Sequence, residues 1–282
     1  MTAPDTYELF AVKYAHHGER YANLNFIGGD PHDGPMPLDF YVWLARGATR
    51  SFVVDLGFNA ETARHRKREI LRNPAEGLRL LDIDPATVED VILTHLHYDH
   101  VGNFDLFPQA NFHVQDKEMA YATGRYMAHR PFAEAYAVDD VVGLVREVYK
   151  GRVTFHDGDA ELAPGLSVHH IGGHTAGLQV VRVMTRRGWV VLASDVTHFY
   201  ENMESGRPFT TAVNVGGMLD GFDALAAHAP AKDHIVPGHD PLVMARYPAV
   251  SPELAGIAVR LDVEPQLATD TVRATRTKGE TQ

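Results

Sequence analysis

The sequence predicts an α/β fold that is built from two similar halves. Short apolar strands alternate with helical stretches, and a second run of strands, followed by a helix and one more strand, repeats the order of the first half. Histidine and aspartate residues follow several of these strands directly, where a rigid sheet presents convergent side chains. We expect a single domain over residues 1–262. Apolar content falls after it, so residues 263–282 are predicted to form a partly disordered tail.

The first half begins with predicted strands over residues 7–12 and 20–27. The next stretch, 29–37, contains three prolines and is predicted to be a loop that leans over a pocket mouth. Residues 40–45 and 51–55 have the pattern of a β-hairpin.

A strongly charged stretch, residues 61–72, predicts an exposed helix that ends before Pro74. We interpret its basic residues as a solvated helix face rather than as a binding patch; they are Arg64, Arg66, Lys67 and Arg68. Further on, Asp84 is suited to cap a short helix that starts at Pro85.

The chain is organised around the stretch Thr94-His95-Leu96-His97-Tyr98-Asp99-His100, which follows an apolar strand at residues 91–93. Side chains two residues apart along an extended chain project to the same side, so His95 and His97 can reach one metal ion. Asp99 and His100 come from the turn that follows, which suits a second ion beside the first. Imidazole and carboxylate are ligands that zinc accepts.

The second half supplies three more candidate ligands, each at the end of a predicted strand. His174 follows the strand at 166–171, Asp195 follows 188–194, and His239 follows 234–236. The full pattern is therefore His-x-His-x-Asp-His, then His 74 residues on, Asp 21 further and His 44 further. The remaining predicted elements of this half are strands at 152–156 and 178–185 and a helix at 218–229.

This pattern resembles the metallo-β-lactamase superfamily of binuclear metallohydrolases and, within it, the N-acyl-homoserine lactonase group. The resemblance covers residues 35–248 and implies an αββα four-layer sandwich, in which two mixed β-sheets are flanked by helices. It also implies two zinc ions per chain, one on His95, His97 and His174, the other on Asp99, His100 and His239, with Asp195 bridging both. Asp55, in an Asp-x-Gly turn, would orient a ligand histidine from behind; capping of the turn is the alternative role.

The composition argues against several classes of protein. The chain has 282 residues, no cysteine and a formal net charge of −11. Without cysteine there is no disulfide, thiolate ligand or cysteine nucleophile, and the chain departs from the superfamily members that use a cysteine where it has Asp195. The acidic charge disfavours nucleic acid as a partner. Since no apolar run reaches the ~18 residues of a membrane span and the N-terminus lacks a signal pattern, we expect a cytoplasmic protein.

The resemblance implies a hydrolase that opens a lactone ring by attack of a metal-bridged hydroxide. Two neighbouring divalent ions lower the pKa of a shared water enough to supply hydroxide near neutral pH, and Asp99 would pass a proton to the leaving oxygen. The lactonase group usually has a tyrosine three residues after the bridging aspartate, where this chain has His198. We expect His198 to replace it as a hydrogen-bond or proton donor, with Tyr200 as the second candidate.

The substrate stays open at the level of sequence. Candidate pocket walls are Phe26, Met36, Phe199, Phe209 and Met218. Another cyclic ester, a cyclic amide or a thioester is the alternative substrate, and a metal-binding sensor without catalysis is a further alternative, because one fold serves many activities. Histidine and aspartate also bind other first-row divalent metals. The resemblance is compatible with a homodimer.

Overall fold

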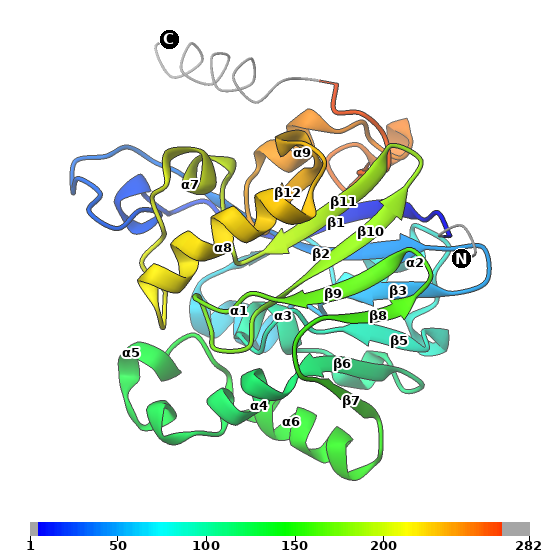
Figure 1. Ribbon diagram of the computed structural model, residues 1–282, viewed down its shortest axis with the longest axis horizontal. Helices are drawn as coiled ribbons and strands as arrows, with labels where there is room; N and C mark the ends of the chain where they lie inside the picture. Colours follow the sequence, from blue (N-terminus) through cyan, green and yellow to red (C-terminus); the bar gives the residue numbers. More distant parts are fainter. Residues whose placement is uncertain (1–4, 267–282) are drawn as a thin grey trace.

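The computed structural model describes residues 5–266 and contains two mixed β-sheets with helices on both outer faces (Figure 1). The predicted α/β sandwich of two mixed sheets is therefore confirmed. Residues 267–282, most of the predicted tail, lie outside the described residues.

The larger sheet has eight strands in the order β13-β1-β2-β3-β5-β6-β7, with β4 paired to β1. The bounds are β1 (Glu8–His17), β2 (Leu38–Arg46), β3 (Ser51–Val54), β4 (Glu69–Ile70), β5 (Asp90–Ile92), β6 (Asn111–Gln115), β7 (Val153–His156) and β13 (Ala258–Arg260). Strands β1 to β3 pair antiparallel, whereas β3, β5, β6 and β7 are parallel neighbours. The parallel part requires crossover connections, and helices of the first half provide them.

The smaller sheet has five strands in the order β12-β11-β10-β9-β8. The bounds are β8 (Ala160–Ala163), β9 (Leu166–His170), β10 (Gln179–Thr185), β11 (Gly188–Ser194) and β12 (Ile235–Pro237). Strand β10 is antiparallel to both β9 and β11, and β11 is parallel to β12. Strands β9, β11 and β12 therefore run in one direction and end at the same edge of the sheet.

Alternation of side chains along the strands produces the four layers. In β1, Leu9 faces the core between the two sheets, and its neighbour Phe10 faces the helices behind the larger sheet. In β11, Leu192 joins the same central core, whereas Val191 packs under α8. Successive residues of a strand point to opposite faces, so apolar residues on both faces bury both sides of each sheet.

The helices cover the outer faces of the sheets. The bounds are α1 (Ala60–Arg66), α2 (Pro74–Arg79), α3 (Tyr98–Val101), α4 (Asp116–Ala122), α5 (Arg130–Ala133), α6 (Val138–Tyr149), α7 (Tyr200–Ser205), α8 (Val215–His228) and α9 (Leu242–Arg246). Side chains from α1 to α4 and α6 pack in the core behind the larger sheet, and α8 packs against the smaller sheet.

Two sequence predictions of local structure are wrong. Residues 20–27 form turns and a short 3-10 helix instead of a strand, and the Asn25 side chain donates to the backbone oxygen of Met36, which ties this segment to the following loop. The predicted helix at 61–72 ends at Arg66, since Lys67 adopts a left-handed conformation with φ of 54° and the chain then pairs with β1.

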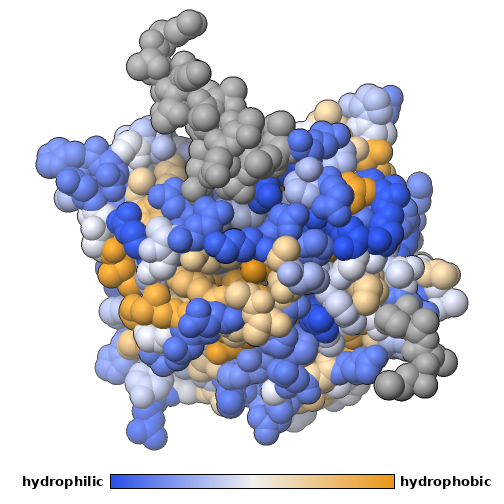
Figure 2. All heavy atoms as spheres, turned by 45° about the horizontal axis from the view of Figure 1, so that its top comes forward, coloured by the Kyte–Doolittle hydropathy of each residue, from blue (hydrophilic) through white to orange (hydrophobic). Residues whose placement is uncertain are grey.

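The surface agrees with the acidic, polar composition. On the face drawn in Figure 2, hydrophilic residues cover most of the surface and hydrophobic residues gather mainly near its centre. Among residues 5–266, every helix is too short or too polar to cross a bilayer.

Candidate metal centre

The two sheets bring their strand ends together around one cluster of histidines and aspartates. Strand β5 ends at Ile92, and the buried segment after it carries His95 and His97 up to the start of α3. Asp99 and His100 lie within the single turn of α3. The loops after β9, β11 and β12 bring His174, Asp195 and His239 to the same place. Six of the seven side chains are buried, and Asp99 is slightly exposed, at 9%.

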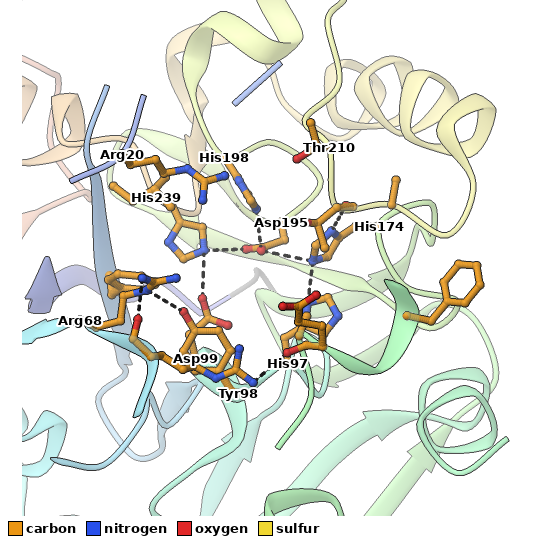
Figure 3. Close-up of a pocket in the computed structure, with 18 of the residues that line it drawn as sticks. Arg20, Arg68, His97, Tyr98, Asp99, His174, Asp195, His198, Thr210 and His239 are labelled. Atoms are coloured by element: carbon orange, nitrogen blue, oxygen red, sulfur yellow. Dashed lines mark hydrogen bonds and ion pairs between the residues drawn. The ribbon is translucent and has the colours of Figure 1, made fainter. Parts of the chain in front are cut away.

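The two carboxylate oxygens of Asp195 face two different groups of imidazoles. Its Oδ2 lies 3.3 Å from His174 Nε2 and 3.8 Å from His95 Nε2. Its Oδ1 lies 3.1 Å from His239 Nε2 and 3.4 Å from His100 Nε2. Asp195 therefore stands between the two halves of the cluster (Figure 3).

The first group has the nitrogen spacing of a zinc site. Two nitrogen ligands at zinc–nitrogen distances of ~2.0–2.1 Å in a tetrahedron lie about 3.3 Å apart. His97 Nδ1 lies 3.1 Å from His95 Nε2 and 2.8 Å from His174 Nε2. The three nitrogens converge on a common point, close to the spacing that such an ion imposes.

The second group contains Asp99, His100 and His239. Asp99 Oδ1 is 3.8 Å from His100 Nε2, and its Oδ2 is 3.8 Å from His239 Nε2. Among the described residues, His100 Nε2 and Asp195 Oδ1 lack a hydrogen-bond partner, although these two atoms are only 3.4 Å apart. Two buried polar atoms at this distance, neither with a hydrogen-bond partner, are spaced as two ligands of one ion would be.

Neighbouring acceptors set the tautomers of three of the candidate ligands. His174 Nδ1 donates to the backbone oxygen of Thr211 at 2.7 Å, and His239 Nδ1 donates to that of Asp39 at 2.9 Å. A carbonyl oxygen only accepts, so each Nδ1 carries the proton and a neutral ring presents the lone pair of Nε2 to the cluster.

Asp55 has the same effect on His100. Its Oδ2 accepts from His100 Nδ1 at 2.7 Å, while Thr94 donates to both carboxylate oxygens at 2.8 Å. Asp55 is fully buried and has a positive φ of 60°, so the turn directs its carboxylate inward. Partners of this kind orient metal-binding histidines and raise their basicity.

The pKa values of the cluster also fit a metal centre. Burial is the main reason that the pKa values of His95, His97 and His174 lie below the ordinary value, which favours the neutral, metal-binding form. Burial also acts to lower the pKa of His100, but Asp195 and Asp55 raise it well above its ordinary value. These carboxylates supply negative charge that a cation would balance. The donor set therefore fits two divalent ions.

His198 and Tyr200 have different environments. His198 Nε2 donates to Asp195 Oδ2 at 2.8 Å, and the His198 ring lines the pocket beside the cluster. Burial lowers the pKa of His198 to about 3, so the ring is neutral near pH 7. Tyr200 lies in the core between the sheets, where its ring contacts the Arg246 guanidinium at 4.4 Å. Of the two candidates, His198 is the one that faces the pocket.

A cavity of about 410 Å³ opens onto the cluster. Its apolar wall includes Leu38, Phe40 and Phe132, and Thr210 and Thr211 contribute polar atoms. These residues replace the pocket walls that the sequence predicted.

The five side chains that were expected to form the pocket wall lie elsewhere in the fold. Phe209 stacks on the His198 ring with centroids 3.4 Å apart and supports it from behind. Phe26 packs under the Arg207 guanidinium, and Phe199 belongs to the core behind the larger sheet. Met36 packs against that same core, and Met218 is buried under the loop of His174. Their apolar character fits a position in the core as well as one in a pocket wall, and only the packing of the folded chain distinguishes the two.

Sequence reasoning missed Glu118, a fully buried carboxylate behind the cluster. Its Oε1 accepts from Leu96 N at 3.0 Å and from the Tyr136 hydroxyl at 3.1 Å, and its Oε2 accepts from Gly177 N at 2.9 Å. Glu118 thus ties the segment of His97 to the loop of His174. A Cβ at Gly177 would lie 2.1 Å from Glu118 N, so only glycine permits this approach.

The interpretation of the basic helix face is wrong for two of its four residues. Arg64 and Lys67 are exposed, but Arg66 and Arg68 are partly buried and line the pocket. The helix ends at Arg66 and Lys67 is left-handed, so Arg68 is not part of the exposed helix face that the sequence predicted.

The four-layer fold and the cluster of histidines and aspartates between the two sheets define a class of αββα proteins with potential metal ligands at the strand ends. Residues 38–256 match the family model of the metallo-beta-lactamase superfamily. The chain belongs to this superfamily.

Several relatives share one name. The chain is 31% identical over 162 residues to an N-acyl homoserine lactonase of Rhizobium rhizogenes. The aligned residues cover 55% of this chain and 56% of the relative. It is 29% identical over 133 residues to an N-acyl homoserine lactonase of Bacillus thuringiensis, and this alignment covers 47% of this chain and 48% of the relative. The chain thus spans about half the length of the relatives that it matches.

Solved structures share the fold. A quorum-quenching N-acyl homoserine lactone lactonase superposes with a TM-score of 0.71 at 20% identity, covering 86% of this chain and 95% of the other. A dizinc quorum-quenching lactonase with a bound product superposes with a TM-score of 0.66 at 15% identity, covering 85% and 90%. At such identities the likeness establishes the fold.

Proposed function

We propose that the protein is a metal-dependent hydrolase that opens the ring of a lactone. The observation that carries this proposal is the position of Asp195, whose two carboxylate oxygens face two separate groups of imidazoles at the base of a cavity. The relatives support the choice of reaction, because those described above are named N-acyl homoserine lactonases.

We assign the metal ligands as two sets that share one residue. His95, His97 and His174 hold one ion; Asp99, His100 and His239 hold the other; and Asp195 lies between both. Zinc suits these nitrogen and oxygen donors, although other first-row divalent ions are accepted by the same residue types. Two such ions supply hydroxide near neutral pH and polarise a carbonyl oxygen.

The side chains of this protein then position the substrate and move protons. Asp99 is partly exposed to the cavity, so its carboxyl group can hand a proton to the oxygen that leaves when the ring opens. His198 is neutral and lines the cavity, so its ring carries one N–H, at Nε2, which points to Asp195 Oδ2. With the Asp195 oxygens bound to metal, this N–H would be available to donate to the oxygen on which negative charge develops. Phe209 stacks on His198 and fixes the orientation of its ring.

Proton release tests the reaction directly. Zinc-loaded protein is mixed with a panel of lactones that includes short- and long-chain N-acyl homoserine lactones, simple γ-lactones and aromatic lactones. We expect acidification with at least one class and its loss in Asp195→Asn. Asp223→Asn is the matched control, because Asp223 is exposed on α8. Acidification that persists in Asp195→Asn would contradict the assignment, and silence across the panel would shift the proposal to cyclic amides or thioesters.

A further inference from the structure

Three arginines line the pocket next to the candidate metal centre. Arg20 follows β1, Arg66 ends α1, and Arg68 comes two residues later. All three are partly buried, and Arg20 and Arg68 lie on the same side of the cluster as His239 (Figure 3). Three carboxylates also line the pocket, namely Asp99, Asp195 and Glu134, and the first two are assigned above to the metal ions. With those two carboxylates bound to metal, the pocket would be positively charged in a chain whose formal net charge is −11.

Neutral groups hold the guanidiniums of Arg66 and Arg68 in place. Arg66 Nη2 donates to the backbone oxygens of Glu134 at 2.9 Å and Tyr136 at 3.1 Å, and the guanidinium lies 3.8 Å from the centre of the Tyr98 ring. Arg68 donates to the Tyr98 hydroxyl at 3.2 Å and to the backbone oxygen of Arg66 at 2.8 Å. Tyr98 therefore orients both side chains without neutralising either charge.

Arg20 is held in the same manner. Its Nε donates to the side-chain oxygen of Asn25, and its Nη2 donates to the backbone oxygen of Leu24 at 3.0 Å. Burial, and after it the charge of Arg68, lower the pKa of Arg20 to about 10. Asp99 and Asp195 oppose this effect only in part, and both are assigned above to the metal ions.

The described part of the chain offers these arginines no carboxylate at ion-pair distance, although the partly buried Arg152 and Arg187 each have one. Arg152 contacts Glu147 at 2.9 Å, and Arg187 contacts Glu264 at 3.3 Å. The one further carboxylate that lines the pocket, Glu134, contacts the exposed Arg130 at 3.2 Å instead. The pocket thus presents positive charge that the fold leaves for another group.

We propose that the substrate is a lactone that carries a carboxylate, which binds to Arg20, Arg66 and Arg68 while the ring lies over the metal centre. This inference rests on the proposed lactonase function and narrows its substrate class. Guanidinium matches carboxylate in a planar, bidentate arrangement. A neutral lactone would cover these partly buried charges without pairing them, and unpaired charges are costly to bury. The cavity of about 410 Å³ suits a compact molecule.

A pair of compounds that differ only in charge tests the inference. The first is γ-butyrolactone with a carboxylate at its γ-carbon, and the second has a primary carboxamide there. Hydrolysis breaks the ring ester bond, adds one water and leaves an α-hydroxy acid or its amide with a new carboxylate. We expect kcat/KM to be at least about tenfold higher for the carboxylate, because hydrogen bonds between two charged groups are stronger than those that a neutral carboxamide makes to guanidinium.

Two variants and a control connect this preference to the pocket. Arg66→Gln and Arg20→Gln keep polar side chains of related length and remove one charge each. Each is expected to reduce the carboxylate-to-carboxamide ratio of kcat/KM about tenfold, and added salt is expected to reduce it in the wild type. Arg64→Gln is the matched control, because Arg64 is exposed on the same helix and lies outside the pocket lining. Thermal unfolding verifies that each variant is folded.

The outcomes separate this inference from the proposed function. If neutral lactones are hydrolysed as well as the carboxylate, and the ratio is the same in Arg66→Gln, the inference is wrong and the lactonase function stands. If neither compound nor the wider panel is hydrolysed, the proposed function fails. Calorimetric titration of the same two compounds then decides the inference: tighter binding of the carboxylate that is lost in Arg66→Gln supports it, and equal or absent binding overturns it.

Discussion

Glu118 offers a demanding test of how the candidate centre is held together. The Glu118→Ala substitution removes the acceptor for Leu96 N and Gly177 N, two backbone groups on the segments that carry His97 and His174. Each buried donor left without a partner costs about 1–3 kcal/mol. We therefore expect the free energy of unfolding to fall by about 2–6 kcal/mol. Glu118→Gln keeps the volume and one acceptor oxygen, so its loss should be smaller.

Denaturant unfolding of the metal-free protein measures the effect of these two variants. The metal affinity of the folded Glu118→Gln variant is the second measurement, because loosened segments should present the ligands less well. Glu161→Ala is the matched control, since Glu161 is exposed on β8 and surface changes usually stay within about 0.5 kcal/mol. A wild-type unfolding midpoint for Glu118→Ala would refute the reasoning.

Three further predictions concern single side chains. Asp55→Asn should weaken metal binding about 10- to 100-fold, as measured by competition with a chelator, because it disturbs the hydrogen bond to His100; an unchanged affinity would contradict this. His198→Ala should lower kcat more than it raises KM, by on the order of a hundredfold in kcat, if His198 stabilises developing charge; unaltered turnover would remove it from the mechanism. Burial alone would raise the pKa of Asp90, but hydrogen bonds from His113 and Arg50 lower it to about 2. Ionised Asp90 therefore stabilises the fold above about pH 4 and loses this effect as the pH falls through about 2. Asp90→Asn should lower the free energy of unfolding by about 1–2 kcal/mol at pH 7, a value discounted because Arg50 is exposed to solvent. Near pH 2 the same substitution should cost almost nothing. Unfolding at both pH values measures the difference, and an equal cost at both would contradict this account.

The sequence predicts the part of this protein that depends on local pattern. Apolar strands that end in histidine or aspartate identify the edge of the sandwich where His95, His174 and His239 meet, because strand direction and strand ends are local properties. Asp55 was also accessible to sequence reasoning, since an Asp-x-Gly turn leaves a recognisable signal.

The parts that sequence reasoning missed depend on contacts between distant segments. Glu118 lies in an ordinary helical stretch, and only the fold reveals that its carboxylate joins two loops. Arg66 and Arg68 read as solvent-facing because the helix was expected to continue through Lys67. Phe26 satisfied the compositional criterion for a pocket wall but packs against Arg207 instead. Hydrophobicity does not distinguish a core position from a pocket position.

The central claim is that one aspartate joins two metal sites, and metal content measures it most directly. Metal ions per chain are counted by mass spectrometry after dialysis for the wild type, Asp195→Asn and the control His65→Ala, which alters an exposed histidine of α1. The account predicts two ions per chain in the wild type and the control, and loss of at least one in Asp195→Asn. Two tightly bound ions in Asp195→Asn, or fewer than two in the wild type supplied with excess zinc, would contradict it.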